Sequence, residues 1–125
     1  MAIVFQVASA AAALLHVLFF ALESLWWPRP AVRRAFGLTA DQAETTRLLA
    51  FNQGFYNLFL ALGAAWGQVA PSLGQPVAGR AVSVFALGSM LGAALVLLRS
   101  RPSAWQGALA QGLPPLVALG ALVAS

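Results

Sequence analysis

The chain has 125 residues, of which 61% are hydrophobic and only 8% are charged. Soluble domains usually contain about 25% charged residues, so this composition excludes an ordinary soluble domain and predicts an all-α integral membrane protein. The net charge of +4 comes from arginines that stand singly or in pairs between apolar runs, which argues against a nucleic-acid partner.

The first predicted helix is the apolar segment from about Ile3 to Trp27, residues 3–27. It ends at Pro28-Arg29-Pro30 because proline lacks an N–H donor and disfavours further helix. The segment exceeds the roughly 20 residues that a membrane span needs. No basic stretch precedes its apolar part, so we interpret it as a retained span and not as a signal peptide.

The second and third predicted helices cover residues 40–69 and 77–98. Thr39 and Gln42 have the spacing of a capping box, which predicts the start of the second helix. Pro76 suits the first turn of the third helix. Each segment is long enough to cross the hydrocarbon core.

The fourth predicted helix covers residues 103–124. Ser103 and Gln106 also have capping-box spacing and predict its start. Pro114 and Pro115 interrupt the helix midway. Such a break is tolerated in a membrane only where protein or water satisfies the freed carbonyls, so we expect it to lie against protein and not lipid.

The four helices predict one transmembrane four-helix bundle, a single domain of residues 1–125. Only Arg80 lies on the side opposite the first and third connections. The arginines on the side of those connections are Arg29, Arg33, Arg34, Arg47, Arg99 and Arg101. By the positive-inside rule both termini are therefore non-cytoplasmic, in a multi-pass protein of a cell membrane such as the bacterial inner membrane. Three tryptophans fall at the predicted cytoplasmic interface: Trp26, Trp27 and Trp105.

Two pairs of glycines spaced four residues apart predict close helix packing. Gly63 and Gly67 lie on the second helix, and Gly88 and Gly92 lie on the third. Such packing serves either contacts within one chain or contacts between the copies of a homo-oligomer.

Polar side chains inside the predicted membrane segments are costly, so each is a candidate for a functional site. They lie at matched depths in the predicted cytoplasmic half of the first, second and fourth helices. They are His16, Glu23, Asn52, Gln53, Tyr56, Asn57 and Gln111. His16 and Glu23 are seven residues apart and share one face of an α-helix. We therefore predict one polar pocket.

These residue types predict that the pocket binds the polar end of a lipophilic small molecule. His16 and Glu23 would be the catalytic pair, because both can take up and return a proton. The substrate-binding residues would be Asn52, Gln53, Tyr56, Asn57 and Gln111. Cysteine is absent and carboxylates are few, so we expect no metal site and no cofactor.

A purely structural role is the alternative for the same residues. Glu23 could pair with Arg47, and amides in membrane helices often hydrogen-bond to neighbouring helices, contributing about 0.6 kcal/mol on average. The number of polar groups favours a site, since such packing needs only one or two amides.

The motifs that carry this cluster resemble those of a known family. They are His16-x-x-Phe19-x-x-x-Glu23, Trp27, Phe36-Gly37 and Asn52-Gln53-Gly54-x-Tyr56-Asn57. The pattern is similar to that of small bacterial and fungal four-helix membrane proteins of unknown function, some of which are labelled "epimerase". The resemblance implies the four-helix fold and a shared polar site. A weaker analogy to sterol-isomerase-type membrane proteins favours proton-shuttling chemistry.

Two other functions fit the same features. Four helices with one membrane carboxylate also suit a small proton-coupled transporter or exporter that works as an oligomer. A structural accessory subunit would use the polar residues only to lock helices together. In all three cases membrane lipid is a partner.

Overall fold

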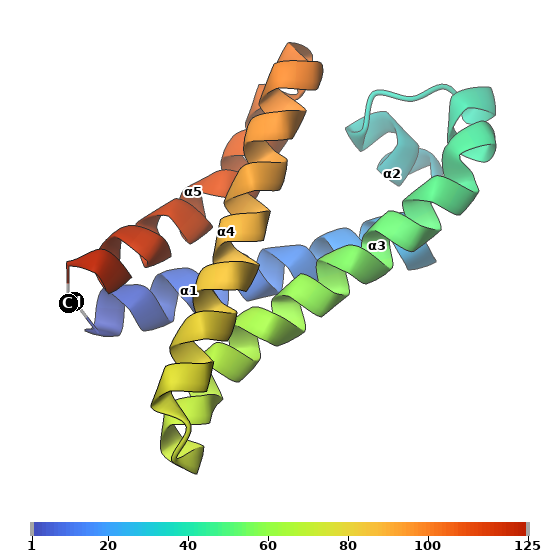
Figure 1. The fold of residues 1–125 in the computed structure, drawn as a ribbon. Helices are drawn as coiled ribbons and strands as arrows, with labels where there is room; N and C mark the ends of the chain where they lie inside the picture. The colour runs from blue at the N-terminus through green and yellow to red at the C-terminus, as the bar shows by residue number, and fades with distance from the viewer. Residues whose placement is uncertain (1, 125) are drawn as a thin grey trace. The chain divides into compact units, whose positions relative to one another are not determined.

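The computed structural model describes residues 2–124, which fold into helices joined by short turns, with no strand among them (Figure 1). The elements in chain order are α1 (Ala2–Phe20), the π-helical turn η1 (Ala21–Leu25), α2 (Pro30–Ala35), α3 (Ala40–Val69), the 3-10 turn η2 (Ala70–Leu73), α4 (Pro76–Ser100), the 3-10 turn η3 (Pro102–Ala104) and α5 (Trp105–Val123).

Four of the helical segments are long and apolar enough to cross a membrane. They are Ala2–Leu25, Ala40–Leu73, Pro76–Ser100 and Pro102–Val123. Large apolar side chains are exposed along all four, for example Leu14, Phe59, Phe85 and Leu109. Exposed apolar surface of this extent is unfavourable in water and favourable in lipid. The chain is an all-helical membrane protein.

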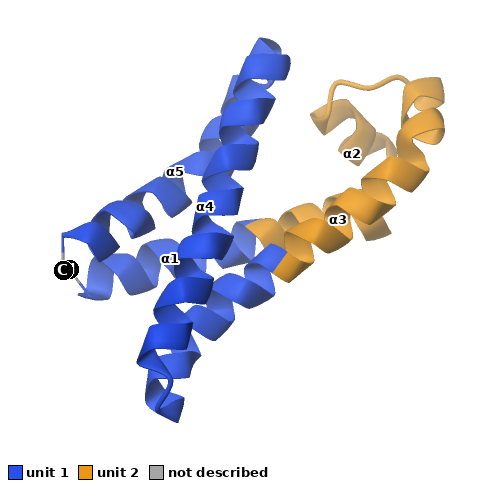
Figure 2. Cartoon of the chain, viewed as in Figure 1, with its two compact units in different colours: residues 1–15, 60–125 blue, residues 16–59 orange. Residues whose placement is uncertain are grey.

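The chain divides into two compact units (Figure 2). Unit 1 comprises residues 1–15 and 60–125, and unit 2 comprises residues 16–59. Both α1 and α3 contribute one part to each unit. The single domain expected from the sequence stays a prediction.

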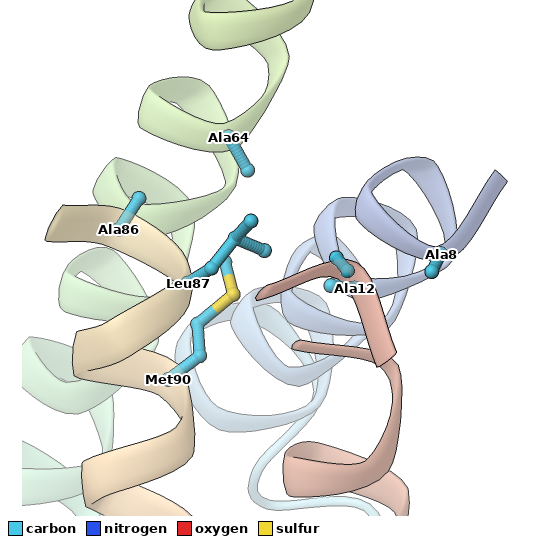
Figure 3. Close-up of a cluster of buried hydrophobic side chains, with 7 residues drawn as sticks. Ala8, Ala12, Ala64, Ala86, Leu87 and Met90 are labelled. Carbon is cyan, nitrogen blue, oxygen red and sulfur yellow. The ribbon is translucent and has the colours of Figure 1, made fainter. Parts of the chain in front are cut away.

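The core of unit 1 is built mainly from alanines of all four long helices. Leu87 and Met90 are fully buried and project from α4 into the space that these alanines line (Figure 3). The buried residues of this core are Ala8, Ala12, Ala64, Ala86, Leu87, Met90 and Ala118. Small side chains let helix backbones approach closely, which favours association in a membrane where no hydrophobic force drives it.

The glycine pair of α3 packs against α4, as expected. A Cβ on Gly67 would overlap Ser83 Oγ and lie 3.0 Å from the Gly79 carbonyl oxygen. A Cβ on Gly63 would lie 3.2 Å from that of Ala86. The glycine pair of α4, in contrast, has open space where its side chains would be. Only the first of the two glycine motifs therefore serves packing within the described chain.

The helices α4 and α5 lie side by side in unit 1. A Cβ on Gly112 would lie 2.8 Å from that of Ala94. Pro115 is fully buried, which confirms that this part of the proline pair lies against protein. At the other end, Arg80 Nη2 donates to the Leu122 carbonyl oxygen at 3.1 Å, where a cation stabilises the C-terminal end of α5.

The expected capping box at the start of α5 is wrong. The helix begins at Trp105, its N-cap is Ala104, and no side chain caps it. Residues Pro102–Ala104 form a 3-10 turn instead, so Ser103 lies inside that turn and not at the N-cap position.

The turns of unit 2 have well-defined caps. Thr39 Oγ1 accepts from Gln42 N–H at 3.2 Å and Gln42 Oε1 accepts from Thr39 N–H at 3.0 Å, which confirms the capping box at α3. The helix α2 ends in a Schellman motif: Gly37 has φ +67°, and Leu38 N–H donates to the Arg33 carbonyl oxygen at 2.8 Å. The positive φ explains the glycine in Phe36-Gly37.

The contrast between the two glycine pairs generates a test of the close packing in unit 1. We expect Gly67→Ala to lower the free energy of unfolding by about 1–3 kcal/mol, because its Cβ meets backbone and Ser83. Gly88→Ala is the matched control: its Cβ meets open space, so we expect no loss and a gain of up to about 1 kcal/mol from the helix propensity of alanine. Thermal unfolding in detergent micelles measures both. Equal effects of the two substitutions would contradict this account of the packing.

Candidate functional site

The candidate site lies in unit 2, where the end of α1 meets the first half of α3. Glu23 stands in the π-helical turn η1. There, Trp26 N–H donates to the Ala21 carbonyl oxygen at 2.9 Å, a bond that spans five residues instead of four. The sequence analysis assumed an uninterrupted α-helix from His16 to Glu23, and this assumption is wrong. A π-helical turn is rare and often occurs at functional sites.

The Glu23 carboxylate is held by an amide of α3. Asn57 Nδ2–H donates to Glu23 Oε2 at 2.7 Å. Asn57 is buried and Glu23 is half-buried. A hydrogen bond to a charged acceptor in such surroundings is stronger than one between neutral groups. The bond occupies one carboxylate oxygen and leaves the other for a further partner.

A close approach of the two segments makes this hydrogen bond geometrically possible. Ser24 Oγ–H donates to the Phe51 carbonyl oxygen at 2.7 Å. A Cβ on Gly54 would overlap Ser24 Oγ and lie 3.1 Å from the Phe20 carbonyl oxygen. Only glycine fits at position 54, and this gives the Asn-Gln-Gly motif a physical reason. The sequence analysis did not assign a role to Ser24. Its position directly after Glu23 was the signal that could have drawn attention to it.

Aromatic rings support the same contact. The Phe20 and Phe55 rings meet edge to face, with centroids 5.1 Å apart. Phe51 and Phe55, one helical turn apart on α3, have centroids 5.1 Å apart. These rings pack the helices together.

Trp27 anchors the connection between α1 and α3. Its indole Nε1–H donates to the Ala43 carbonyl oxygen at 2.8 Å, and its ring lies 4.9 Å from that of Phe36. Its exposed fraction is only 6%, so Trp27 packs inside unit 2 and does not face lipid, and its expected position at the membrane interface stays a prediction. Trp26 is more exposed, and the guanidinium carbon of Arg29 lies 5.3 Å from the centroid of its ring.

A pocket of about 340 Å³ opens beside Glu23. Its lining residues come from the end of α1, the following turn and α3, and are Glu23, Ser24, Leu25, Trp27, Pro28, Arg47, Leu48 and Phe51. A volume of this size lies within the range of small-molecule sites, about 300–1,000 Å³. Arg47 is a second charged group of the pocket that the sequence analysis did not place in the site.

The alternative pairing of Glu23 with Arg47 is not observed. Arg47 Nη2 lies 3.7 Å from Glu44 Oε1, and both side chains are largely exposed. A surface pair of this kind contributes little to stability. Glu23 and Arg47 therefore line one pocket while each has another partner.

His16 lies apart from this pocket. It is fully buried, and its ring meets that of Phe19 edge to face with centroids 5.5 Å apart. It is not among the residues that line the pocket. The structure thus brings Glu23 and Asn57 together, and the joint action of His16 and Glu23 stays a prediction.

The other candidate residues face outward or belong to unit 1. Asn52, Gln53 and Tyr56 are exposed on α3. Asn52 Nδ2–H donates to the Leu48 carbonyl oxygen of its own helix at 3.1 Å. Gln111 is half-buried in unit 1. Their roles in substrate binding stay predictions. Within residues 2–124, no group of three or more His, Cys, Asp or Glu side chains could hold a metal ion.

The contrast between Asn57 and Asn52 allows a test of the central hydrogen bond. We expect Asn57→Ala to lower the free energy of unfolding by about 1–3 kcal/mol, because it leaves a half-buried carboxylate without its donor. Asn52→Ala removes an exposed amide that bonds only to its own helix, so we expect a change within about 0.5 kcal/mol. Denaturant unfolding in detergent measures both. Similar values would show that the Glu23–Asn57 bond contributes nothing specific.

Comparison with protein-family models gives a match over nearly the whole chain. Residues 10–123 match the model of a family described as "Protein of unknown function (DUF1304)". Comparisons with curated proteins and with solved structures gave no match. The matched range includes every residue of the candidate site. The chain therefore belongs to the DUF1304 family.

Proposed function

We propose that this membrane protein binds a lipophilic small molecule with a polar end in the pocket beside Glu23. The observation that carries the proposal is the half-buried Glu23 carboxylate, held by Asn57 at 2.7 Å, in the wall of a pocket of about 340 Å³. A carboxylate in a membrane segment is costly and marks a functional site by default. One hydrogen bond orients it without using both of its oxygens.

The remaining walls of the pocket support a lipophilic ligand. Leu25, Leu48 and Phe51 line the pocket and are exposed on the outside of unit 2. A molecule entering from the membrane would pass along these apolar side chains before its polar end met Glu23. Mostly apolar walls with a few polar groups are typical of small-molecule sites.

The chemistry that we propose for this pocket is proton transfer. Glu23 would take a proton from the ligand or return one, with Asn57 keeping the carboxylate oriented. His16 would be the second proton-transferring group, as the sequence predicts. The "epimerase" label in the resembling family supports this reaction class, because epimerisation at an acidic carbon removes a proton and returns one on the other face.

The arginine distribution supports a cytoplasmic position for this pocket. Arg29, Arg33 and Arg34 follow the first span, Arg99 lies in the last turn of the third, and Arg101 follows the third. By the positive-inside rule these connections face the cytoplasm, both termini lie outside, and the protein belongs in a cytoplasmic membrane such as the bacterial inner membrane.

Two neighbouring leucines of α3 provide a test of binding. Leu48 lines the pocket and is 72% exposed, whereas Leu49 is 70% exposed and lies outside it. We expect Leu48→Trp to fill the pocket and reduce the amount of lipophilic molecule that co-purifies with the protein, while Leu49→Trp leaves it unchanged. Mass spectrometry of organic extracts measures the amount. Equal extracts from both variants and the unmodified protein would refute the proposal.

A deuterium-exchange experiment tests the proton transfer. The co-purified molecule is returned to the purified protein in D₂O, and mass spectrometry follows incorporation of deuterium at carbon. We expect Glu23→Gln to reduce the rate by at least about 100-fold, the lower range of general acid–base catalysis. Glu44→Gln, an exposed acid outside the pocket, is the control. Exchange at an unchanged rate in Glu23→Gln would exclude Glu23 as the proton carrier.

A further inference from the structure

Two of the four lining side chains that can form hydrogen bonds use their donor within the protein. The Ser24 hydroxyl and the Trp27 indole N–H each donate to a backbone carbonyl of α3. Glu23 and Arg47 are the two charged side chains of the lining, and both keep hydrogen-bonding capacity for a ligand. The pocket therefore offers a ligand one acidic and one basic group.

The two charged groups are separate. Glu23 uses Oε2 for its bond to Asn57, and the described residues provide no partner for Oε1. The Arg47 guanidinium has five N–H donors, and its contact with Glu44 is long, at 3.7 Å, and exposed. Among residues 2–124, no ion pair joins Glu23 to Arg47. A ligand with a donor and an anion could therefore satisfy both without breaking a bond inside the protein.

The pocket lies at the end of the first candidate membrane span, which is where lipid headgroups are expected. The first span ends at Leu25, which is itself a lining residue. Just beyond it, the Arg29 guanidinium lies over the Trp26 ring. Tryptophan and arginine are typical of the boundary between hydrocarbon and headgroups. A lipid headgroup would enter the pocket laterally from the headgroup layer. Its acyl chain would stay outside and lie along the exposed Leu48 side chain.

We infer that the pocket binds the headgroup of a zwitterionic amphiphile that carries a primary ammonium and a phosphate, as a phosphoethanolamine lipid does. This inference rests on the proposed function and names its ligand class. The ammonium N–H groups donate to Glu23, and the phosphate accepts from the Arg47 guanidinium, a geometry that favours two parallel bonds. The acyl chain extends over the apolar rim.

Other headgroups fit the two charges less well. A purely anionic headgroup brings like charge against Glu23, and a purely cationic one offers no acceptor to the Arg47 guanidinium. A trimethylammonium group keeps its charge but has no N–H donor for the carboxylate. A neutral glycerol headgroup offers no anion to the guanidinium. The primary ammonium and phosphate together satisfy both charged groups.

Three probes with the same acyl chain separate these possibilities. They are lysophosphatidylethanolamine, lysophosphatidylcholine and a monoacylglycerol, each titrated against the full chain in a non-ionic detergent and followed by native mass spectrometry. We expect lysophosphatidylethanolamine to bind at least about tenfold more tightly than either other probe, as the loss of one charge-assisted hydrogen bond implies. Water-soluble phosphoethanolamine should not displace it, because it lacks the chain.

Two substitutions test which charged residue recognises the ammonium and which recognises the phosphate. Glu23→Gln should remove the preference for ethanolamine over choline. Arg47→Gln should lower the affinity for both phosphate-containing probes to that for the monoacylglycerol. Arg47→Lys should retain most of the affinity. Glu44→Gln is the control, because it removes the exposed partner of Arg47 and leaves the pocket intact. We expect binding to Glu44→Gln to be unchanged or tighter.

The outcomes distinguish this inference from the proposed function. If the three probes bind equally and neither Glu23→Gln nor Arg47→Gln alters them, the lipophilic site stands and the zwitterion is overturned. If phosphoethanolamine alone binds as tightly, the need for an acyl chain is overturned. If no probe binds the unmodified chain, the headgroup inference is overturned, and the comparison of extracts from Leu48→Trp and Leu49→Trp decides the proposed function separately. A variant that unfolds is replaced by the conservative Arg47→Lys and by the choline–ethanolamine comparison on the unmodified protein.

Discussion

The structure depends on how closely its helix backbones approach each other. At Gly54, Gly67 and Gly112 a single Cβ would meet a neighbouring atom at 3.1 Å or less. In a membrane, lipid tails are as apolar as leucine, so burial alone does not drive helices together and close contact between backbones must do so. The alanine core of unit 1 and the Gly54 contact of unit 2 are two uses of the same constraint.

In unit 2 this constraint also positions the chemistry. The contact at Gly54 brings Ser24 to a backbone carbonyl of α3, and the residue before Ser24 is the carboxylate that Asn57 holds. Trp27 then fixes the connection from the other side through its bond to Ala43. The pocket lies between these fixed points, so Glu23 is positioned by packing that exists without a ligand, whereas Arg47 is largely exposed.

The sequence predicted features that local chemistry determines. The capping box at Thr39 and the proline at the start of α4 mark helix ends because they act on backbone groups within one turn. The pairing of Glu23 with Asn57 needed tertiary information, as did the buried position of Trp27. The outward direction of Asn52, Gln53 and Tyr56 was unexpected, since polarity alone does not say which face of a membrane helix contacts protein. The π-helical turn has no hydrophobic period that would reveal it.

Because of the π-helical turn, the geometry of the site depends on how many residues separate Phe20 from Trp27. Each residue added to or removed from an α-helix rotates the side chains on either side by about 100° relative to each other. The wide turn at Ala21–Leu25 behaves as an accommodated one-residue insertion between Phe20, which packs on α3, and Trp27, which bonds to it. Relatives that lack one residue here would lose either the aromatic contact or the indole anchor. The number of residues between these two aromatic residues is therefore part of what positions Glu23.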